Sequence, residues 1–195
     1  MAIIVDKEEK RRLIALSCKD LLLENGIKNI TVSDIAGVAG IGKGTIYEYF
    51  SNKDEIVFEI LNILVEDIQK RLRDFFDMQK LSFRNKLKYF LSFLFLPQYT
   101  NELKVYKEFL SISITGATDQ MKEHKKECTN SFELFLEKII EDAIAVEELK
   151  LTKDIIPIIR YFYAGLVINS SLDEINVNAE IERFVSFILG KGGLN

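Results

Sequence analysis

Apolar residues recur every three or four positions along the chain, and almost no segment alternates apolar and polar residues at period two. Leu, Ile, Lys and Glu are frequent, and two prolines in 195 residues leave long segments uninterrupted. This pattern predicts an all-α fold that needs no strands. Hydrophobic residues make up 48% of the sequence, which is ample for a packed core.

Capping residues and glycines divide this pattern into about nine helices. Thr31 followed by Asp34 at the N3 position is a near-variant of the capping box and predicts a short helix, which Gly40-Ile41-Gly42 ends. We therefore expect a small three-helix head, residues 1–52, on a helical body, residues 53–195. The predicted helices are 7–25, 32–39, 43–50, 53–80, 83–96, 99–113, 118–147, 154–172 and 178–189.

The two short helices meet the requirements of a helix-turn-helix. Such a motif needs a small residue where the helices cross, a glycine in the turn, and apolar residues that hold the second helix at a steep angle. Ala36, Gly40 and Ile46 fall at that spacing. A miniature core is completed by Ile35, Ala39, Ile41 and Phe50. The residues left facing outward are Lys43, Thr45, Tyr47, Glu48 and Tyr49.

These outward residues suit a DNA surface. Gly44 lets the backbone approach closely, Lys43 and Lys53 supply positive charge, and Glu48 can accept a hydrogen bond from a cytosine amino group. The hydroxyls able to donate to phosphate oxygens belong to Thr31, Thr45, Tyr47 and Tyr49. Two alternatives stay open: the tyrosines can be core aromatics, and Glu48 can be an ordinary solvated residue.

The stretch TVSDIAGVAGIGKGTIYEYFSNKDEI, with the helix before it, resembles the amino-terminal signature of the tetracycline-repressor (TetR) family. The resemblance implies that Thr31 is a phosphate-binding cap and that Lys43, Gly44 and Glu48 occupy variable specificity positions. It implies DNA contacts at Thr45, Tyr47, Tyr49 and Lys53. A homodimeric repressor on a pseudo-palindromic double-stranded DNA operator, released by an inducer bound in the body, is the function that this resemblance implies.

The charge distribution gives little support to the prediction of DNA binding. Residues 1–53 carry eight basic and seven acidic side chains, a net +1, whereas the remainder carries 18 basic and 23 acidic, a net −5. A strongly basic head is typical of tight electrostatic DNA binding. The weak charge therefore keeps an alternative open, in which the chain is a helical small-molecule or protein-binding module without useful DNA binding.

Aromatic residues are dense in the predicted body. Any single ring is more often core than ligand pocket, but as a group large rings favour a cavity for an apolar or aromatic small molecule. The resemblance raises this interpretation, because the family binds its inducers in the body. The expected pocket residues are Phe90, Leu94, Tyr106, Phe109, Phe132, Phe135 and Phe162.

The last two predicted helices carry more apolar surface than one chain can cover. The first is apolar nearly all round and the second has a broad apolar stripe, so both are expected to pack against their copies in a two-fold dimer. The alternative is that both are simply interior. The expected interface residues are Ile159, Phe162, Leu166, Phe184 and Ile188.

Nothing in the sequence predicts an enzyme, a cofactor or a metal site. We expect no catalytic residues, because nucleophile elbows, phosphate-binding glycine loops and carboxylate clusters with metal spacing are missing. Cys18 and Cys128 are expected to be free thiols, and His124 to lie on a solvated face among charged residues. Without a secretory signal or a long apolar run, the expected location is the cytoplasm.

Overall fold

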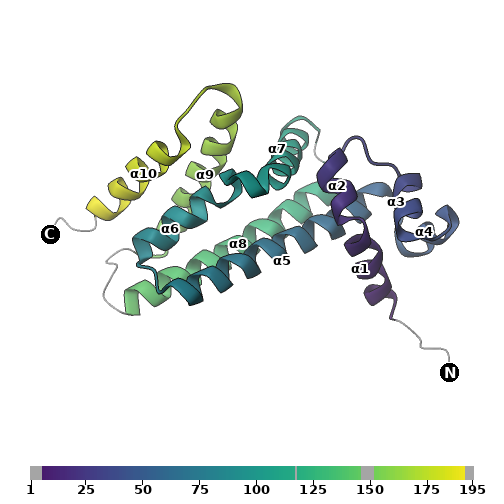
Figure 1. The fold of residues 1–195 in the computed structure, drawn as a ribbon, viewed down its shortest axis with the longest axis horizontal. Helices are drawn as coiled ribbons and strands as arrows, with labels where there is room; N and C mark the ends of the chain where they lie inside the picture. Colours follow the sequence, from purple (N-terminus) through teal and green to yellow (C-terminus); the bar gives the residue numbers. More distant parts are fainter. Residues whose placement is uncertain (1–5, 117, 146–151, 192–195) are drawn as a thin grey trace. The chain divides into compact units, whose positions relative to one another are not determined.

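A computed structural model describes residues 6–116, 118–145 and 152–191. Within these ranges the secondary structure is helical and contains no strand, which confirms the all-α expectation (Figure 1). The α-helices are α1 (Lys7–Ser17), α2 (Lys19–Asn25), α3 (Val32–Ala39), α4 (Lys43–Tyr49), α5 (Lys53–Gln79), α6 (Phe83–Ser92), α7 (Thr100–Thr115), α8 (Asp119–Ala145), α9 (Ile155–Leu172) and α10 (Val177–Lys191). Two short 3-10 helices, η1 (Phe93–Phe95) and η2 (Pro97–Tyr99), join α6 to α7.

The first predicted helix is divided at Cys18, which separates α1 from α2. The hydroxyl of Ser17 donates to the carbonyl of Ile14 at 2.7 Å, and such a local bond competes with the helical ladder. Cys18 is fully buried, and its thiol donates to the carbonyl of Ile35 at 3.6 Å. The break therefore lies where the chain is held against α3.

The predicted helix 83–96 also ends early, because α6 stops at Ser92 and tightens into η1. Pro97 lacks an N–H and disfavours helical backbone in the residue before it. Leu96 is accordingly extended, with φ −70° and ψ 142°. The predicted end of helix 118–147 lies outside the described residues.

The described residues form two compact units, which we call the amino-terminal and carboxy-terminal units. The amino-terminal unit comprises Met1–Ile68 and Asn101–His124, and the carboxy-terminal unit comprises Gln69–Thr100 and Lys125–Asn195. The boundary predicted after residue 52, between a DNA-binding and a ligand-binding domain, is a functional division and stays a prediction.

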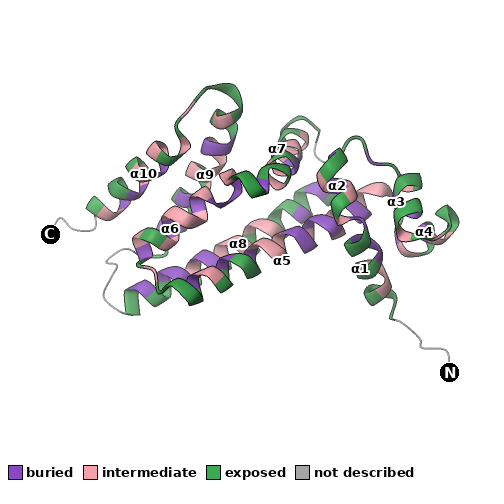
Figure 2. Ribbon diagram, in the orientation of Figure 1, coloured by how far each residue is buried: buried purple, intermediate pink, exposed green. Residues whose placement is uncertain are grey.

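The amino-terminal unit has one apolar core, to which each of its helices contributes. Ile14, Leu22, Ile35, Ile46 and Ile60 are each almost completely buried. In Figure 2, α3 and α4 are drawn mostly as exposed and half-buried residues, and Ile35, Ala36 and Ile46 are their buried members. Burial of so many large apolar side chains stabilises the position of two helices that are each too short to be stable alone.

The carboxy-terminal unit is rich in ring contacts. Phe75 stacks on Tyr89 with centroids 3.9 Å apart, and Phe93 stacks on Tyr99 at 4.1 Å. Offset ring pairs of this kind add to the free energy gained from burial alone. These rings connect α5, α6 and the 3-10 segment that follows.

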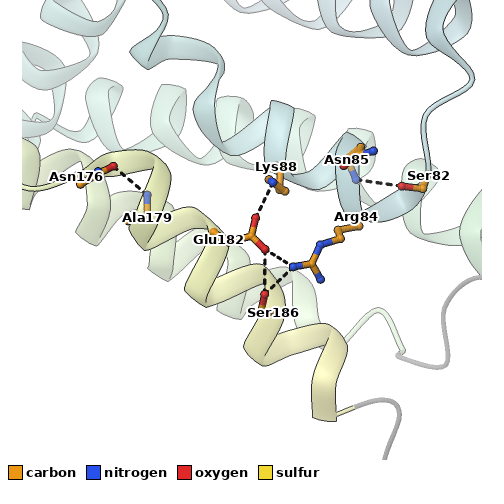
Figure 3. A network of polar contacts seen from close by, with 8 residues as sticks. All are labelled: Ser82, Arg84, Asn85, Lys88, Asn176, Ala179, Glu182 and Ser186. Atoms are coloured by element: carbon orange, nitrogen blue, oxygen red, sulfur yellow. Dashed lines mark hydrogen bonds and ion pairs between the residues drawn. The ribbon is translucent and has the colours of Figure 1, made fainter.

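A polar network holds α10 against α6 (Figure 3). The carboxylate of Glu182 accepts hydrogen bonds from Lys88 at 2.6 Å and from Arg84, and the hydroxyl of Ser186 lies 3.1 Å away. The bond from Lys88, followed by that from Arg84, lowers the pKa of Glu182 to about 2. The carboxylate therefore stays ionised well below neutral pH.

Among the described helices, α9 alone is long and apolar enough to cross a membrane by length and composition. A single helix of this kind is weak evidence for a span. Of this helix, 28% is buried within the chain, and four of its large apolar side chains, Ile158, Tyr161, Ile168 and Leu172, remain exposed.

Candidate nucleic-acid interface

The start of α3 is fixed by a complete capping box. The hydroxyl of Thr31 accepts a hydrogen bond from the backbone N–H of Asp34 at 3.2 Å, and the Asp34 carboxylate accepts from the Thr31 N–H at 2.9 Å. The Thr31 hydroxyl also donates to that carboxylate at 2.7 Å, and this bond lowers the pKa of Asp34 below its usual value. The capping predicted from sequence is confirmed. Contact of Thr31 with phosphate stays a prediction.

The turn between α3 and α4 depends on Gly40. Its φ of 66° and ψ of 29° lie in the left-handed region, which glycine enters without steric cost. The N–H of Gly40 donates to the carbonyl of Gly37, and the N–H of Ile41 donates to that of Ala36 at 3.1 Å. These bonds satisfy two of the last four carbonyls of α3 and direct the chain into α4.

The predicted scaffold of the motif lies inside the unit. Ala36, Ile46 and Phe50 are buried, with Ile46 completely inaccessible, and Ile35 joins them in the same core. Gly40 is the exposed member, because it forms the turn itself.

The outward face of α4 is open to solvent. Lys43, Gly44 and Glu48 are exposed, and Tyr47 is 51% exposed, so Tyr47 is not a core aromatic. A side chain added at Gly44 would meet no atom within 4 Å, so packing within the chain does not require a glycine there. The outward face of α4 is therefore accessible to a ligand that approaches its backbone closely.

The remaining predicted DNA contacts are partly covered. Thr45 is half-buried, and Tyr49 is half-buried against the core of the amino-terminal unit. The ammonium group of Lys53 donates to the carbonyls of Ile27 at 3.1 Å and Ile30 at 3.3 Å. An ammonium has three N–H groups, so one donor remains after these two bonds. Their contacts with DNA stay predictions.

Arg11 holds the carboxyl end of α4, a role that the sequence analysis missed. Its guanidinium donates to the carbonyl oxygen of Tyr49 and lies over the ring of Phe50, 4.5 Å from the centroid. It also forms an ion pair with Glu55 at 3.6 Å. A cation at the negative end of a helix dipole is stabilising. The only signal in the sequence is the basic run at residues 10–12. It predicts positive charge but does not indicate which element Arg11 contacts.

Glu55 forms the other side of this contact. Its carboxylate accepts from the backbone N–H of Ser51 at 3.0 Å, which, with a smaller contribution from Arg11, lowers the pKa of Glu55. The Asn52 side chain caps α5 by accepting from the Glu55 N–H at 3.0 Å. The segment between α4 and α5 is therefore fixed on both sides.

The residues expected to line a ligand pocket fall in both units. Phe90, Leu94, Phe132, Phe135 and Phe162 belong to the carboxy-terminal unit, whereas Tyr106 and Phe109 belong to the amino-terminal unit. In the first group, the ring of Phe90 lies 6.2 Å from that of Phe132 and 6.0 Å from that of Phe135. The ligand role of all seven stays a prediction.

His124 is buried, not solvated as the sequence analysis expected. Only 3% of it is exposed, its ring stacks on Phe58 at 4.7 Å, and its edge faces Phe109 at 5.8 Å. Burial lowers its pKa to about 4, so it is neutral at pH 7. The missed signal is the spacing of Met121, His124 and Cys128, which places all three on one side of α8 despite their charged neighbours.

The predicted dimer residues are mostly covered inside the carboxy-terminal unit. Ile159, Leu166 and Ile188 are buried, and the half-buried rings of Phe162 and Phe184 stack face to face at 3.7 Å. The apolar side chains that these two helices leave exposed are a different set. They are Ile158, Tyr161, Ile168 and Leu172 on α9 and Phe187 on α10.

Comparison with known proteins identifies the amino-terminal segment. Residues 19–60 match the family described as bacterial regulatory proteins, tetR family. The HTH-type transcriptional regulator PksA of Bacillus subtilis is 30% identical over 70 residues, which is 36% of this chain and 34% of PksA. The HTH-type transcriptional repressor KstR2 of Mycobacterium tuberculosis is 39% identical over 57 residues, 29% of this chain and 28% of KstR2. These matches span about a third of the length of the relatives.

Solved structures match over nearly the whole chain. A TetR-family transcriptional regulator from Cytophaga hutchinsonii has a TM-score of 0.75 at 15% identity and covers 98% of this chain and 99% of its own. The regulator FadR of Bacillus subtilis, solved with stearoyl-CoA, has a TM-score of 0.66 at 21% identity and covers 94% and 98%. At these identities the likeness concerns the fold. Residues 19–60 therefore match the helix-turn-helix segment of the tetR family, and the described residues share the fold of solved TetR-family regulators.

Proposed function

We propose that the chain is a transcriptional repressor that binds a pseudo-palindromic operator as a homodimer and is released by a small apolar or aromatic effector. The observation that carries this proposal is the α3-turn-α4 motif, whose scaffold is buried while Lys43, Tyr47 and Glu48 stay open to solvent. These three side chains of α4, the proposed recognition helix, are not needed for packing within the chain, so they are available to bind a ligand. The site of action would be the cytoplasm, where the operator lies.

The outward residues would make two kinds of contact with DNA, one to phosphates and one to a base. Lys43 and the hydroxyls of Thr45 and Tyr47 would contact phosphates, which positions the protein without reading sequence. Glu48 would accept from a cytosine amino group in the major groove. Two copies would place α4 in successive major grooves, with half-sites roughly 34 to 36 Å or somewhat more apart.

The exposed apolar stripe on α9 supports the homodimer. Ile158, Tyr161, Ile168 and Leu172 recur at helical spacing along one side of α9, and Figure 2 shows exposed residues alternating with buried ones along this helix and α10. Contiguous exposed apolar surface of this kind marks an interaction site. Packing α9 and α10 against their copies would cover it in a four-helix bundle.

The carboxy-terminal unit supports an apolar effector. The ring of Phe90 packs near those of Phe132 and Phe135, and it also lies 6.4 Å from the ring of Tyr163. The similar fold of FadR was solved with stearoyl-CoA, a ligand with a long apolar chain. A coupling of about 1–3 kcal/mol between effector and DNA would weaken operator binding roughly 5- to 150-fold.

A mobility-shift assay tests the proposal. The purified protein is titrated onto duplexes from the region upstream of its own gene at two salt concentrations. We expect a shift that weakens as salt rises, because phosphate contacts release counterions. A protein that shifts none of these fragments at low salt would instead be a helical binding module without DNA recognition.

A further inference from the structure

The loop between α2 and α3, residues 26–30, directly precedes the cap of the DNA-binding motif. Gly26 begins it with a φ of 80° and donates its N–H to the carbonyl of Leu22 at 2.8 Å. Ile27 and Ile30 are buried, and Thr31 follows as the cap of α3. The position of this loop therefore sets where α3 starts.

Glu108, on α7, binds two backbone N–H groups of this loop. Its carboxylate accepts from the N–H of Ile27 at 2.7 Å and from that of Lys28 at 2.9 Å. Hydrogen bonds from successive N–H groups to an ionised carboxylate are among the stronger ones in proteins. The contact joins residues that lie 81 and 80 positions apart in the sequence.

Lys53 binds the same loop through its carbonyls. The ammonium group donates to the carbonyl oxygens of Ile27 and Ile30, at 3.1 and 3.3 Å. The loop thus offers its N–H groups to an anion on α7 and its carbonyl groups to a cation at the start of α5. Two opposite charges fix one short segment of backbone.

Space at the loop is matched to the Glu108 carboxylate. A Cβ atom at Gly26 would lie 2.6 Å from the nearer carboxylate oxygen of Glu108, and its φ of 80° is one that other residues rarely adopt. The glycine is therefore required both by its backbone conformation and by the approach of Glu108.

The helix that carries Glu108 is anchored in the core of the same unit. Val105 and Phe109 are buried, and Phe109 meets the ring of His124 at 5.8 Å. Glu108 directly precedes the buried Phe109 on α7. A shift of this helix would therefore move Glu108 and, through its two hydrogen bonds, the loop of residues 26–30. The loop cannot follow a different path while both hydrogen bonds hold.

We propose that Glu108 is a positioning residue for DNA binding, which ties α7 to the loop of residues 26–30 and thereby sets the placement of α3 and α4. This inference depends on the proposed function, since it assigns how the recognition helix is held. Loss of the carboxylate frees the loop and lowers operator affinity without removing any DNA contact.

The test compares Glu108→Ala and Glu108→Gln with Glu102→Gln, a matched loss of negative charge on the same helix. Removing negative charge alone strengthens DNA binding or leaves it unchanged, because DNA is an anion. We expect Glu108→Ala to weaken binding to a duplex bound by the wild type about 5-fold or more, with Glu108→Gln intermediate and Glu102→Gln at or above wild-type affinity. The sign of the change separates positioning from charge.

Amide hydrogen exchange supplies a readout independent of DNA. In Glu108→Ala the amides of Ile27 and Lys28 should exchange about tenfold faster or more, while those of α5 keep their protection. Unchanged exchange at these two amides, or unchanged affinity in Glu108→Ala, would overturn the inference. If the wild-type protein binds no duplex, the proposed function fails, and the exchange rates alone show whether Glu108 holds the loop.

A double substitution completes the test. Gly26→Ala should weaken DNA binding in the wild type, and it should cost less affinity in the Glu108→Ala background, because the close approach to the carboxylate is then gone. Additive effects of the two substitutions would contradict a shared role.

Discussion

The guanidinium of Arg11, on α1, donates a hydrogen bond to the carbonyl oxygen of Tyr49, the last residue of α4. The same guanidinium lies over the ring of Phe50, so one side chain meets both the end of the recognition helix and the residue after it. The recognition helix is seven residues long, too short to hold its position by its own hydrogen bonds. Its orientation therefore depends on contacts from α1.

Replacement of Arg11 by alanine should lower both stability and operator affinity. It removes a charged hydrogen bond and a cation-π contact, which together predict a loss of about 1–3 kcal/mol in the free energy of unfolding. Urea unfolding followed by circular dichroism measures this loss. Arg12→Ala is the matched control, since Arg12 is about half exposed and pairs with Glu66 at 2.5 Å. Exposed pairs contribute little, and equal losses in the two variants would contradict the role of Arg11.

Replacement of Tyr47 should lower operator affinity while stability stays unchanged. Tyr47 is 51% exposed, so its ring contributes little to the core. We expect both Tyr47→Ala and Tyr47→Phe to bind DNA more weakly, because both lose the hydroxyl proposed to reach a phosphate. Thermal unfolding should agree with the wild type within about 0.5 kcal/mol. Leu16→Ala, an equally exposed position on α1, is the control, and full affinity in both Tyr47 variants would remove this residue from the interface.

Local signals explain why the helix-turn-helix could be predicted from the sequence. Thr31 with Asp34 marks a helix start, and Gly40 marks its end, within a span of ten residues. Ile46 and Phe50 then follow at the spacing of one helix face. Each of these signals acts between neighbours in the chain, so no knowledge of the tertiary structure is needed.

The contacts that hold the motif in place could not be predicted in the same way. Arg11 reaches Tyr49 across 38 residues, and Glu108 reaches Ile27 across 81. Arginines and glutamates are common on helix surfaces, and nothing in their local sequence shows which of them meets a backbone group. Such long-range polar contacts depend on how the helices pack.

The exposed side of α9 also could not be predicted, because an apolar helix has no polar face to indicate direction. Ile158 is exposed and Ile159 is completely buried, although they are the same residue type at adjacent positions. Their hydropathy is the same, so hydropathy alone does not indicate which of the two is exposed. The covering helices, α6 and α10 among them, decide which side remains for a partner.

Charge placed on the exposed side of α9 should separate the proposed dimer. Leu172 is 73% exposed and belongs to the apolar stripe, so Leu172→Glu would bury an unpaired carboxylate in the interface. Sedimentation at micromolar concentration should give the mass of two chains for the wild type and of one for this variant. Met78→Glu, at a position that is 78% exposed on α5, should stay dimeric. A wild-type protein that sediments as one chain would reject the dimer itself.

The buried imidazole of His124 predicts how stability depends on pH. Folding places the ring between Phe58 and Phe109 and lowers its pKa from 6.5 to about 4, because burial disfavours the charged form. Between these two values the unfolded chain binds a proton that the folded chain does not, so the free energy of unfolding falls as the pH falls.

The variant His124→Phe keeps a ring between Phe58 and Phe109 but removes the proton. Since each pKa unit corresponds to about 1.4 kcal/mol, the wild type should lose about 3 kcal/mol more than this variant between pH 7 and pH 4. Carboxylates that titrate in the same range contribute equally to both proteins and cancel in the difference. Urea titrations at half-unit intervals of pH measure it. Two stability curves that run parallel from pH 7 to pH 4 would show that the imidazole is protonated in the folded protein and that Phe58 and Phe109 do not exclude water from it.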